Sequence, residues 1–266
     1  MTRTTTHRHA ADSNYERGLS NVIWAVIFFG VITFMTIGGA VMGFNALDEA
    51  SGGDSRAAAQ EGMLQVRGDM YDLAGGAPYR TTTVDVQDGA LTYGSPIQIE
   101  LSASTGSESM ETQVIEPTPV IYELGDYQYV FVAGAVFLEQ DNGRIIKEGP
   151  SFRIAQKEAI IPLINTTHHD GPEHVSVGGD GQGYITGHKW DTSSTQFQPT
   201  ADGDPVEATA TTKIETPRYE MWASWFRQQS RFTNVNVDED ANTVSAEFTT
   251  NRLFVQTIQT RVRVEV

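Results

Sequence analysis

Cysteine is absent from the 266 residues of this chain, and lysine occurs only at Lys147, Lys157, Lys189 and Lys213. Without cysteine the protein has no disulfides, thiolate zinc sites, iron–sulfur clusters or cysteine nucleophiles. The chain carries 34 Asp and Glu residues and a formal net charge of −16, and such a charge repels nucleic acid, because phosphate binding depends on Lys and Arg. An acidic, hydrated surface is typical of a halophilic, archaeal protein; an ordinary acidic extracellular domain is the alternative.

Motifs that would indicate catalysis are also lacking. The chain has no G-x-S-x-G to place a hydrolase nucleophile, and its Gly-rich stretch at 178–183 lacks the Lys-Ser/Thr of a phosphate-binding loop. Paired carboxylates carry no information in so acidic a chain. We therefore expect a protein that is not an enzyme and needs no cofactor, with an anchored extracellular enzyme as a competing hypothesis.

One long stretch has no charged residue at all. Residues 19–44, LSNVIWAVIFFGVITFMTIGGAVMGF, are apolar on nearly every side of a helix, and about 20 such residues cross a bilayer. A cleaved secretory signal would have a shorter apolar core. We predict a transmembrane helix. The polar leader before it carries Arg3, Arg8 and Arg17, which places the leader in the cytoplasm and the C-terminal region outside the cell.

Two glycines inside the run stand four residues apart. Gly39 and Gly43 form G-x-x-x-G, a spacing that lets two helices approach closely in lipid. Glycine is also simply frequent in membrane helices. Both interpretations stay open, and we name these two residues as the candidate helix-packing positions.

The pattern beyond the run predicts an α+β protein in four parts. Residues 1–18 are the leader and 19–44 the membrane or assembly helix. Residues 45–76 read as a helical stalk with a glycine hinge, and residues 77–266 as a mostly antiparallel, β-sandwich-like extracellular domain with one short helix. In the stalk an apolar stripe predicts a face that packs on this domain; it consists of Met63, Val66, Met70 and Leu73.

Several local expectations inside the β-rich region can be compared with a structure. Asp88-Gly89 predicts a hairpin turn, and so does the sequence around Asn142-Gly143. Residues 128–138 read as one strand, and residues 165–200 as a long polar stretch with short strands at 183–188 and 196–197. A helix is expected over residues 218–232, with its aromatic side chains in the core; these are Trp222, Trp225 and Phe226. A patch that faces the membrane or a partner is the alternative.

The polar stretch contains the candidate modification and metal residues. Asn165 begins the sequon Asn-Thr-Thr, a glycosylation acceptor if it lies outside the cell. His168, His169 and His174 lie close together in sequence, and imidazole with carboxylate suits zinc or copper. Their spacing matches no metal-binding motif. We expect no metal site and regard the three histidines as weak candidates.

The boundary of the apolar run resembles a known processing site. Residues 17–23, RGLSNVI, follow a basic leader and are similar to the N-terminus of archaeal type IV pilin and archaellin precursors. That resemblance implies cleavage by a prepilin-type peptidase between Gly18 and Leu19, after the basic Arg17. The apolar segment would then serve as a membrane anchor and as the packing core of a filament. Ile23 stands where many type IV pilins carry a glutamate used in subunit docking.

A second resemblance covers most of the chain. The order of RGLSNVIWAVIFFG, ALTYGSPIQIEL, YVFVAGAVFLEQDNGRIIKEGPSF and IIPLI is similar to that of a haloarchaeal family of pilin-like, membrane-anchored proteins without an assigned activity. It implies a cell-surface structural subunit that contacts the membrane and other pilin-like subunits. The large β-rich region favours a minor or adhesin-like role over a bulk subunit. The alternative is a single-span envelope or binding protein that forms no filament.

Overall fold

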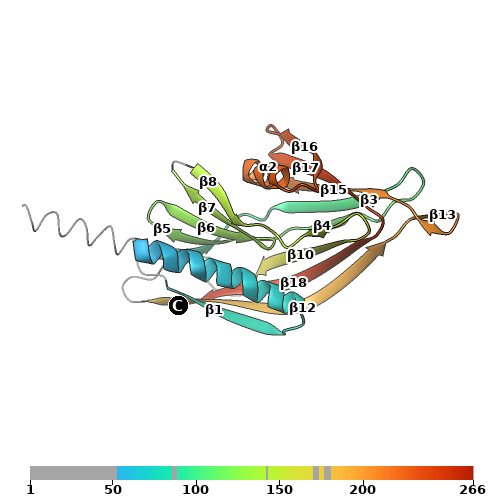
Figure 1. The fold of residues 1–266 in the computed structure, drawn as a ribbon. Coiled ribbons are helices and arrows are strands. Elements are labelled where there is room, and N and C mark those ends of the chain that lie inside the picture. The colour runs from blue at the N-terminus through green and yellow to red at the C-terminus, as the bar shows by residue number, and fades with distance from the viewer. Residues whose placement is uncertain (1–52, 86–88, 142, 170–173, 177–180, 266) are drawn as a thin grey trace, which may run out of the picture. The chain divides into compact units, whose positions relative to one another are not determined.

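The computed structural model describes residues 53–85, 89–141, 143–169, 174–176 and 181–265. The described part is mostly β, with largely antiparallel sheets and two helices, which agrees with the expected β-rich domain (Figure 1). One helix covers residues 53–74, and the second, α2, covers Tyr219–Gln228. The predicted leader and the apolar run at 19–44 lie outside the described residues.

The strands form three larger sheets, named A, B and C here, and one small hairpin. Sheet A has the order β1 (Tyr79–Asp85), β12 (Gln182–Phe197), β18 (Leu253–Glu265), β10 (Ala159–His168) and β9 (Arg153–Ile154). Sheet B has the order β11 (His174–Ser176), β2 (Gly89–Tyr93), β5 (Val120–Leu124), β6 (Tyr127–Val132), β7 (Ala135–Gln140) and β8 (Gly143–Glu148). Sheet C has the order β16 (Thr233–Asp238), β17 (Thr243–Thr250), β15 (Ala208–Glu215), β3 (Gln98–Ser104) and β4 (Gln113–Ile115).

The small hairpin joins β13 (Thr200–Ala201) to β14 (Asp204–Pro205). In the described part of the chain, every pairing between named strands is antiparallel except that of β10 with β18, which is parallel from Ala159↔Leu253 to His168↔Val262. This pairing brings together two segments far apart in sequence, and no local pattern predicted it.

The 53–74 helix lies between sheets A and B (Figure 1). Its inward residues recur at spacings of four and three, the period of a helix face. All of them are completely buried: Ala59, Met63, Val66, Met70 and Leu73. They pack with apolar residues of both sheets, and we call this group the helix cluster. The predicted apolar stripe is therefore confirmed as a core-packing face.

The inner strands of sheet B, such as β6 and β7, are buried on both faces. Along β6, Tyr129 and Phe131 join the helix cluster, whereas Val130 and Val132 belong to a second core. We call this second core the α2 cluster, because it is built from α2, sheet C and the facing sides of sheets A and B. Burial on both faces explains why this strand reads as an uninterrupted apolar run instead of an alternating one.

The aromatic residues of α2 lie in the core, as expected. Trp222, Trp225 and Phe226 are 1%, 7% and 0% exposed. Trp222 meets Phe137 of β7 edge to face, with ring centroids 5.3 Å apart, a favourable arrangement for aromatic pairs. The helix ends at Gln228, earlier than the predicted residue 232, and Phe232 still packs in the α2 cluster.

The hairpin predicted from Asp88-Gly89 is wrong. Strand β1 pairs with β12, and β2 pairs with β5 and β11, so the two strands belong to different sheets. Val84 and Leu91 both pack in the helix cluster, one from sheet A and the other from sheet B. Gly89 serves close packing instead, because a Cβ there would meet the Tyr122 side chain and lie 2.8 Å from Glu123 O.

The single strand predicted over residues 128–138 is also wrong. The chain turns at Ala133 and Gly134, whose φ angles are +52° and +82°, and Val132 pairs with Ala135. Positive φ at both central residues is what a two-residue type I′ turn requires, and alanine is not a usual choice there. The other predicted turn is confirmed, because Gln140 pairs with Gly143.

The polar stretch at 165–200 contains regular structure that its composition concealed. β10 continues to His168, and β12 is a strand of 16 residues, Gln182–Phe197. The inner positions of β12 include two glycines, Gly183 and Gly187, and Ile185. Strands of this kind lack the apolar alternation that marks a strand in sequence. The two short strands predicted at 183–188 and 196–197 both lie in β12, but the prediction missed that they form one long strand.

Candidate functional site

The predicted processing and packing positions fall outside the described residues. Arg17, Gly18, Leu19, Gly39 and Gly43 therefore stay predictions. Within residues 53–85 and the later described ranges, no helix combines the length and the apolar character needed to cross a membrane. The structure does describe how the chain beyond the apolar run is held, and this docking of the 53–74 helix is the candidate functional feature.

The helix approaches sheet A closely because glycine occupies the contact on each side. A Cβ at Gly187 of β12 would lie 2.7 Å from Met70 Cε and 3.0 Å from Leu73 Cδ1. Gly62 of the helix faces β1, where a Cβ would lie 3.1 Å from Val84 Cγ1. Larger side chains at these points would push the helix away from the sheet.

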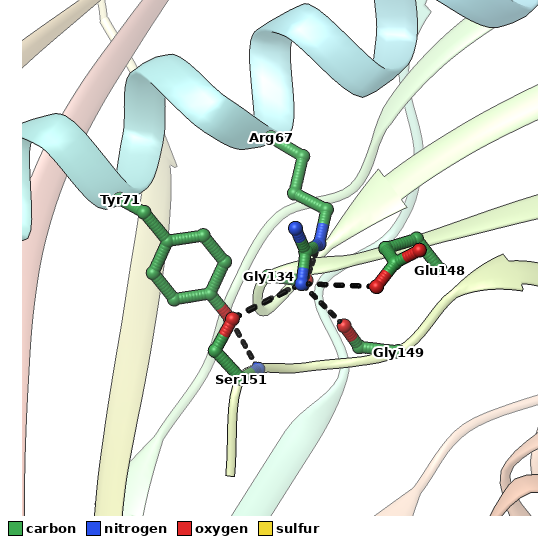
Figure 2. A network of polar contacts seen from close by, with 6 residues as sticks. All are labelled: Arg67, Tyr71, Gly134, Glu148, Gly149 and Ser151. Atoms are coloured by element: carbon green, nitrogen blue, oxygen red, sulfur yellow. Dashed lines mark hydrogen bonds and ion pairs between the residues drawn. The ribbon is translucent and has the colours of Figure 1, made fainter.

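On the opposite side, Arg67 joins the helix to sheet B (Figure 2). Arg67 Nε donates to Gly134 O at 2.9 Å, and one Nη donates to Gly149 O at 2.8 Å. The same Nη reaches Ser151 Oγ at 3.0 Å and Glu148 Oε1 at 3.6 Å. The Arg67 side chain is 18% exposed, so these charge-assisted bonds lie largely out of water.

Tyr71, one helical turn further on, completes the same network (Figure 2). Its hydroxyl accepts the Ser151 N–H at 2.8 Å and lies 3.4 Å from Gly134 O. The Arg67 guanidinium lies 4.9 Å from the Tyr71 ring centroid, a cation–π distance. Any Cβ at Gly134 would collide with the Tyr71 hydroxyl. We call Arg67, Tyr71, Gly134, Glu148, Gly149 and Ser151 the Arg67 clamp.

A second set of polar contacts ties the helix to β1. Thr82 Oγ1 donates to Asp69 Oδ2 at 2.6 Å, and Gln65 Nε2 donates to Asp69 Oδ1 at 3.1 Å. Asp69 is only 8% exposed, so both carboxylate oxygens of a buried acid have partners, as burial demands. Near the end of the helix, Arg80 Nε meets Asp72 Oδ2 at 3.1 Å.

Sequence reasoning missed the Arg67 clamp. The sequence did contain one signal for it. Arg67 and Tyr71 are four residues apart and lie beside the apolar stripe, so they share one flank of the helix. Their partners are mainly backbone carbonyls and a backbone N–H at Gly134, Gly149 and Ser151. Backbone groups leave no pattern in sequence, so the network could not be predicted.

A partly buried ion pair fastens α2 to sheet B. Arg218 Nε and Nη2 donate to the two carboxylate oxygens of Glu139 at 2.6 and 3.2 Å, and the side chains are 16% and 14% exposed. An open pocket of about 800 Å³ lies beside this pair, with Asp126, Asp141 and Glu220 in its lining. Its carboxylates fit the general acidity of the chain and indicate no particular ligand.

The three histidines do not form a site in the described residues. His168 ends β10, with its ring centroid 4.5 Å from that of Tyr93. The backbone N–H of His169 donates to Val262 O at 2.8 Å. His174 begins β11, and its side chain lies outside what the structure describes. Among the described residues, no three His, Asp or Glu side chains converge in a way that could hold a metal ion.

Asn165 lies in a strand and not in the predicted loop. It is part of β10 and pairs with Gln259 of β18. Its Nδ2 donates to Gln259 Oε1 at 2.8 Å, and Nδ2 is the atom that a glycan would occupy. Glycosylation stays a prediction, and in the folded protein it would replace this hydrogen bond.

Two tyrosines near the helix have perturbed ionisation. The Tyr93 hydroxyl donates to Val262 O at 3.0 Å, and burial raises the pKa of Tyr93 well above its usual range. The Tyr129 hydroxyl donates to Arg56 O at 3.0 Å. Burial, followed by the neighbouring Tyr127, raises the pKa of Tyr129. The Tyr93 hydroxyl links sheet B to sheet A, and the Tyr129 hydroxyl links sheet B to the 53–74 helix. Both tyrosines therefore hold elements of the fold together.

Comparison with known proteins adds one finding. Residues 17–263 match the model of a family of unknown function, DUF7289. The chain belongs to this family. The matched region includes the apolar run, the 53–74 helix and nearly all of the three sheets. Neither the curated proteins nor the solved structures gave a match.

Proposed function

We propose that this member of DUF7289 is a type IV pilin-like structural subunit of the cell surface, in a minor or adhesin-like role. One observation carries the proposal. The uncharged run at 19–44 directly follows Arg17-Gly18, and the family match begins at residue 17. The boundary and the run therefore lie inside the region that the family model matches, as we expect of an anchor that the mature protein keeps.

The docking of the 53–74 helix supports an anchored role. In an anchored protein, force along the chain enters the β-rich part through the segment that follows the anchor. Here that segment is a helix whose apolar stripe is completely buried between two sheets. The Arg67 clamp and the contact of Asp69 with Thr82 attach it on both sides. A helix held in this way transmits load to the whole fold.

The proposal has a location and partners. Residues 19–44 form a long hydrophobic helix in the membrane, and the sandwich-like β-rich domain lies outside the cell. The acidic surface suits a halophilic archaeon, and Asn165 is an acceptor for a glycan. A prepilin-type peptidase acts at Gly18, and other pilin-like subunits contact Gly39 and Gly43. We propose no enzymatic activity and no cofactor.

A second candidate is a single-span, membrane-anchored envelope or binding protein that forms no filament. Ile23 favours it, because a glutamate at this position serves subunit docking in many type IV pilins. The size of the β-rich region also favours it over a bulk filament subunit.

N-terminal sequencing tests the processing step. The full chain is expressed in an archaeal host that has a prepilin-type peptidase, extracted from membranes and sequenced. We expect the mature protein to begin at Leu19. Gly18→Val should retain the leader, whereas the control Gly30→Val, inside the apolar run, should still be cleaved. A wild-type protein that keeps Arg17 would contradict the proposal.

Microscopy of sheared appendages separates the two candidates. A filament subunit should appear in the sheared fraction as the processed form. Gly39→Leu with Gly43→Leu should leave processing intact but remove the protein from that fraction. A processed protein found only in membranes, with no change for the double variant, would favour the single-span alternative.

A further inference from the structure

Exposed aromatic side chains of the described residues gather on one surface. Tyr79, Tyr184 and Trp190 are 58%, 37% and 53% exposed, and in the described part they are the only large aromatic side chains exposed to this degree. All three project from β1 and β12 on the outer face of sheet A. The alternate residues Val84 and Ile185 point inward and are completely buried. Exposed aromatic groups collected on one face indicate a binding surface.

Trp190 is presented by a β-bulge. The pairing of β12 with β18 shifts between Lys189 and Asp191, so Trp190 is the extra residue of the strand. Bulges redirect side chains and are frequent beside functional sites. The guanidinium of Arg261 lies 5.1 Å from the centroid of the Trp190 ring, which holds the exposed indole in place.

The neighbouring strand β1 adds a pair of aromatic rings. Tyr79 of β1 stands opposite His188 of β12, with ring centroids 6.0 Å apart. His188 in turn stands opposite Arg261 of β18. These four side chains, Tyr79, His188, Trp190 and Arg261, are therefore contiguous across three strands, and we call them the Trp190 cluster.

The outer face of sheet A next to the Trp190 cluster is rich in hydroxyl groups. Thr81 and Thr83 of β1 and Thr186 of β12 project from the same face, and Thr81 Oγ1 lies 3.0 Å from Thr186 Oγ1. Arg263 is neutralised by Glu265, with the two groups 2.7 Å apart. Flat aromatic rings match the C–H faces of pyranose rings, and hydroxyls, imidazole and guanidinium match sugar hydroxyls.

We propose that the Trp190 cluster binds a neutral glycan chain. A second copy of the protein fits less well, because its acidic surface would need several cations to pair with. Arg261 is the single full charge of the cluster. An uncharged, hydroxyl-rich ligand needs no such pairing. The inference deepens the adhesin-like role proposed above and rests on it for the exposure of this face outside the cell.

Tryptophan fluorescence of the full chain tests the proposal. The protein is held in a detergent without a sugar headgroup and titrated with neutral hexasaccharides of glucose, mannose, galactose and N-acetylglucosamine. Acrylamide quenching is compared with that of Trp190→Phe, which isolates the signal of Trp190. We expect at least one saccharide to protect Trp190 from quenching and to bind equally well at low and high sodium chloride, because stacking is not screened by salt.

Variants assign the binding to the cluster. Trp190→Ala should weaken binding, measured by calorimetry, by about tenfold, the effect of one aromatic contact. The control Ile145→Ala removes a similarly exposed side chain, 51% exposed on β8 of sheet B, and should leave binding unchanged. Binding to no member of the panel, or equal binding by Trp190→Ala, would overturn the proposal.

Other outcomes would reassign the surface. Binding only to acidic saccharides, with loss at high salt, contradicts a neutral ligand. Self-association that Trp190→Ala abolishes in ultracentrifugation assigns the face to a second copy instead. The result is independent of processing: a protein that begins at Leu19 and binds no saccharide overturns this inference alone. A protein that binds saccharide but keeps Arg17 overturns only the pilin-type processing.

Discussion

Arg67 shows what one side chain contributes to this fold. Its guanidinium reaches two backbone carbonyls, Gly134 O and Gly149 O, that come from different connections of sheet B. Only a planar, forked donor satisfies both at 2.9 and 2.8 Å. The Tyr71 ring lies beside the guanidinium, so the charge is held between an aromatic face and backbone dipoles.

Replacing Arg67 should destabilise the protein strongly. Arg67→Ala removes the charged donor of Gly149 O and leaves Gly134 O with only the longer 3.4 Å contact to the Tyr71 hydroxyl, and we expect the free energy of unfolding to fall by roughly 2–4 kcal/mol. Arg67→Lys should recover less than half of the loss, because an ammonium cannot reproduce the fork. Urea unfolding measures both. The control Arg231→Ala, at an exposed position, should change the free energy of unfolding by less than about 0.5 kcal/mol. If Arg67→Ala and this control lower the free energy of unfolding equally, the Arg67 clamp does not stabilise the fold.

Tyr93 predicts an alkaline loss of stability. A free tyrosine ionises near pH 10, whereas burial raises the pKa of Tyr93, so the folded state keeps the proton to higher pH. Because the unfolded state then binds fewer protons than the folded state, the free energy of unfolding falls as pH rises above about 10. Urea titrations from neutral to alkaline pH should show a shallower fall for Tyr93→Phe. Identical slopes for Tyr93→Phe and wild type would contradict the assignment.

At the scale of elements, the 53–74 helix combines three kinds of surface. One face is the buried stripe, the flank with Arg67 and Tyr71 contacts sheet B, and a third face is exposed and includes Glu61, Gly68 and Asp72. Nothing lies within 4 Å of a Cβ placed on Gly68. This glycine thus has no packing role in the described structure, although glycine weakens a helix interior.

Gly68→Ala should stabilise the protein. Alanine has the better helix propensity, and an exposed, uncrowded site should gain roughly 0.5–1 kcal/mol. Thermal unfolding followed by circular dichroism measures the gain. Gly134→Ala is the opposite case, because its φ of +82° and the Tyr71 hydroxyl exclude a Cβ, and we expect a lower melting temperature. A lower melting temperature for Gly68→Ala would show that this face is in contact with something else.

Elements and their partners differ in how well they could be predicted. Residues 120–124 and the start of β17 at Thr243 follow from periodicity and turn residues alone. The pairing of β1 with β12 does not, because its partner lies about a hundred residues away. The turn at Ala133 and Gly134 was missed because two buried faces removed the alternation that marks a strand. In the sequence, only Gly134 inside this apolar run pointed to a turn.

At the scale of the molecule, the two cores share their sheets. Strand β6 places Phe131 in the helix cluster and Val130 in the α2 cluster. Strand β18 does the same with Ile258 and Val255. Because these strands cannot leave one core without disrupting the other, residues 55–266, which form one compact unit, should unfold together.

Core variants in the two clusters test this cooperativity. Met63→Ala in the helix cluster and Phe248→Ala in the α2 cluster both truncate completely buried side chains. Each should lower stability by roughly 2–5 kcal/mol. Circular dichroism and tryptophan fluorescence should report one shared transition for both variants. Fluorescence that stays at the wild-type midpoint in Met63→Ala, while circular dichroism shifts, would show that the cores unfold separately.

By itself, the sequence determined the β-rich class of the described domain, the buried stripe of the 53–74 helix and the aromatic face of α2, because these depend on periodicity within one element. It also placed the uncharged run and the Arg17-Gly18 boundary, which remain predictions. Only the tertiary structure decided the parallel pairing of β10 with β18, the Arg67 clamp and the gathering of Tyr79, Tyr184 and Trp190 on one face. Each of these joins residues distant in the chain, often through backbone groups that every residue shares, so no local pattern can specify them.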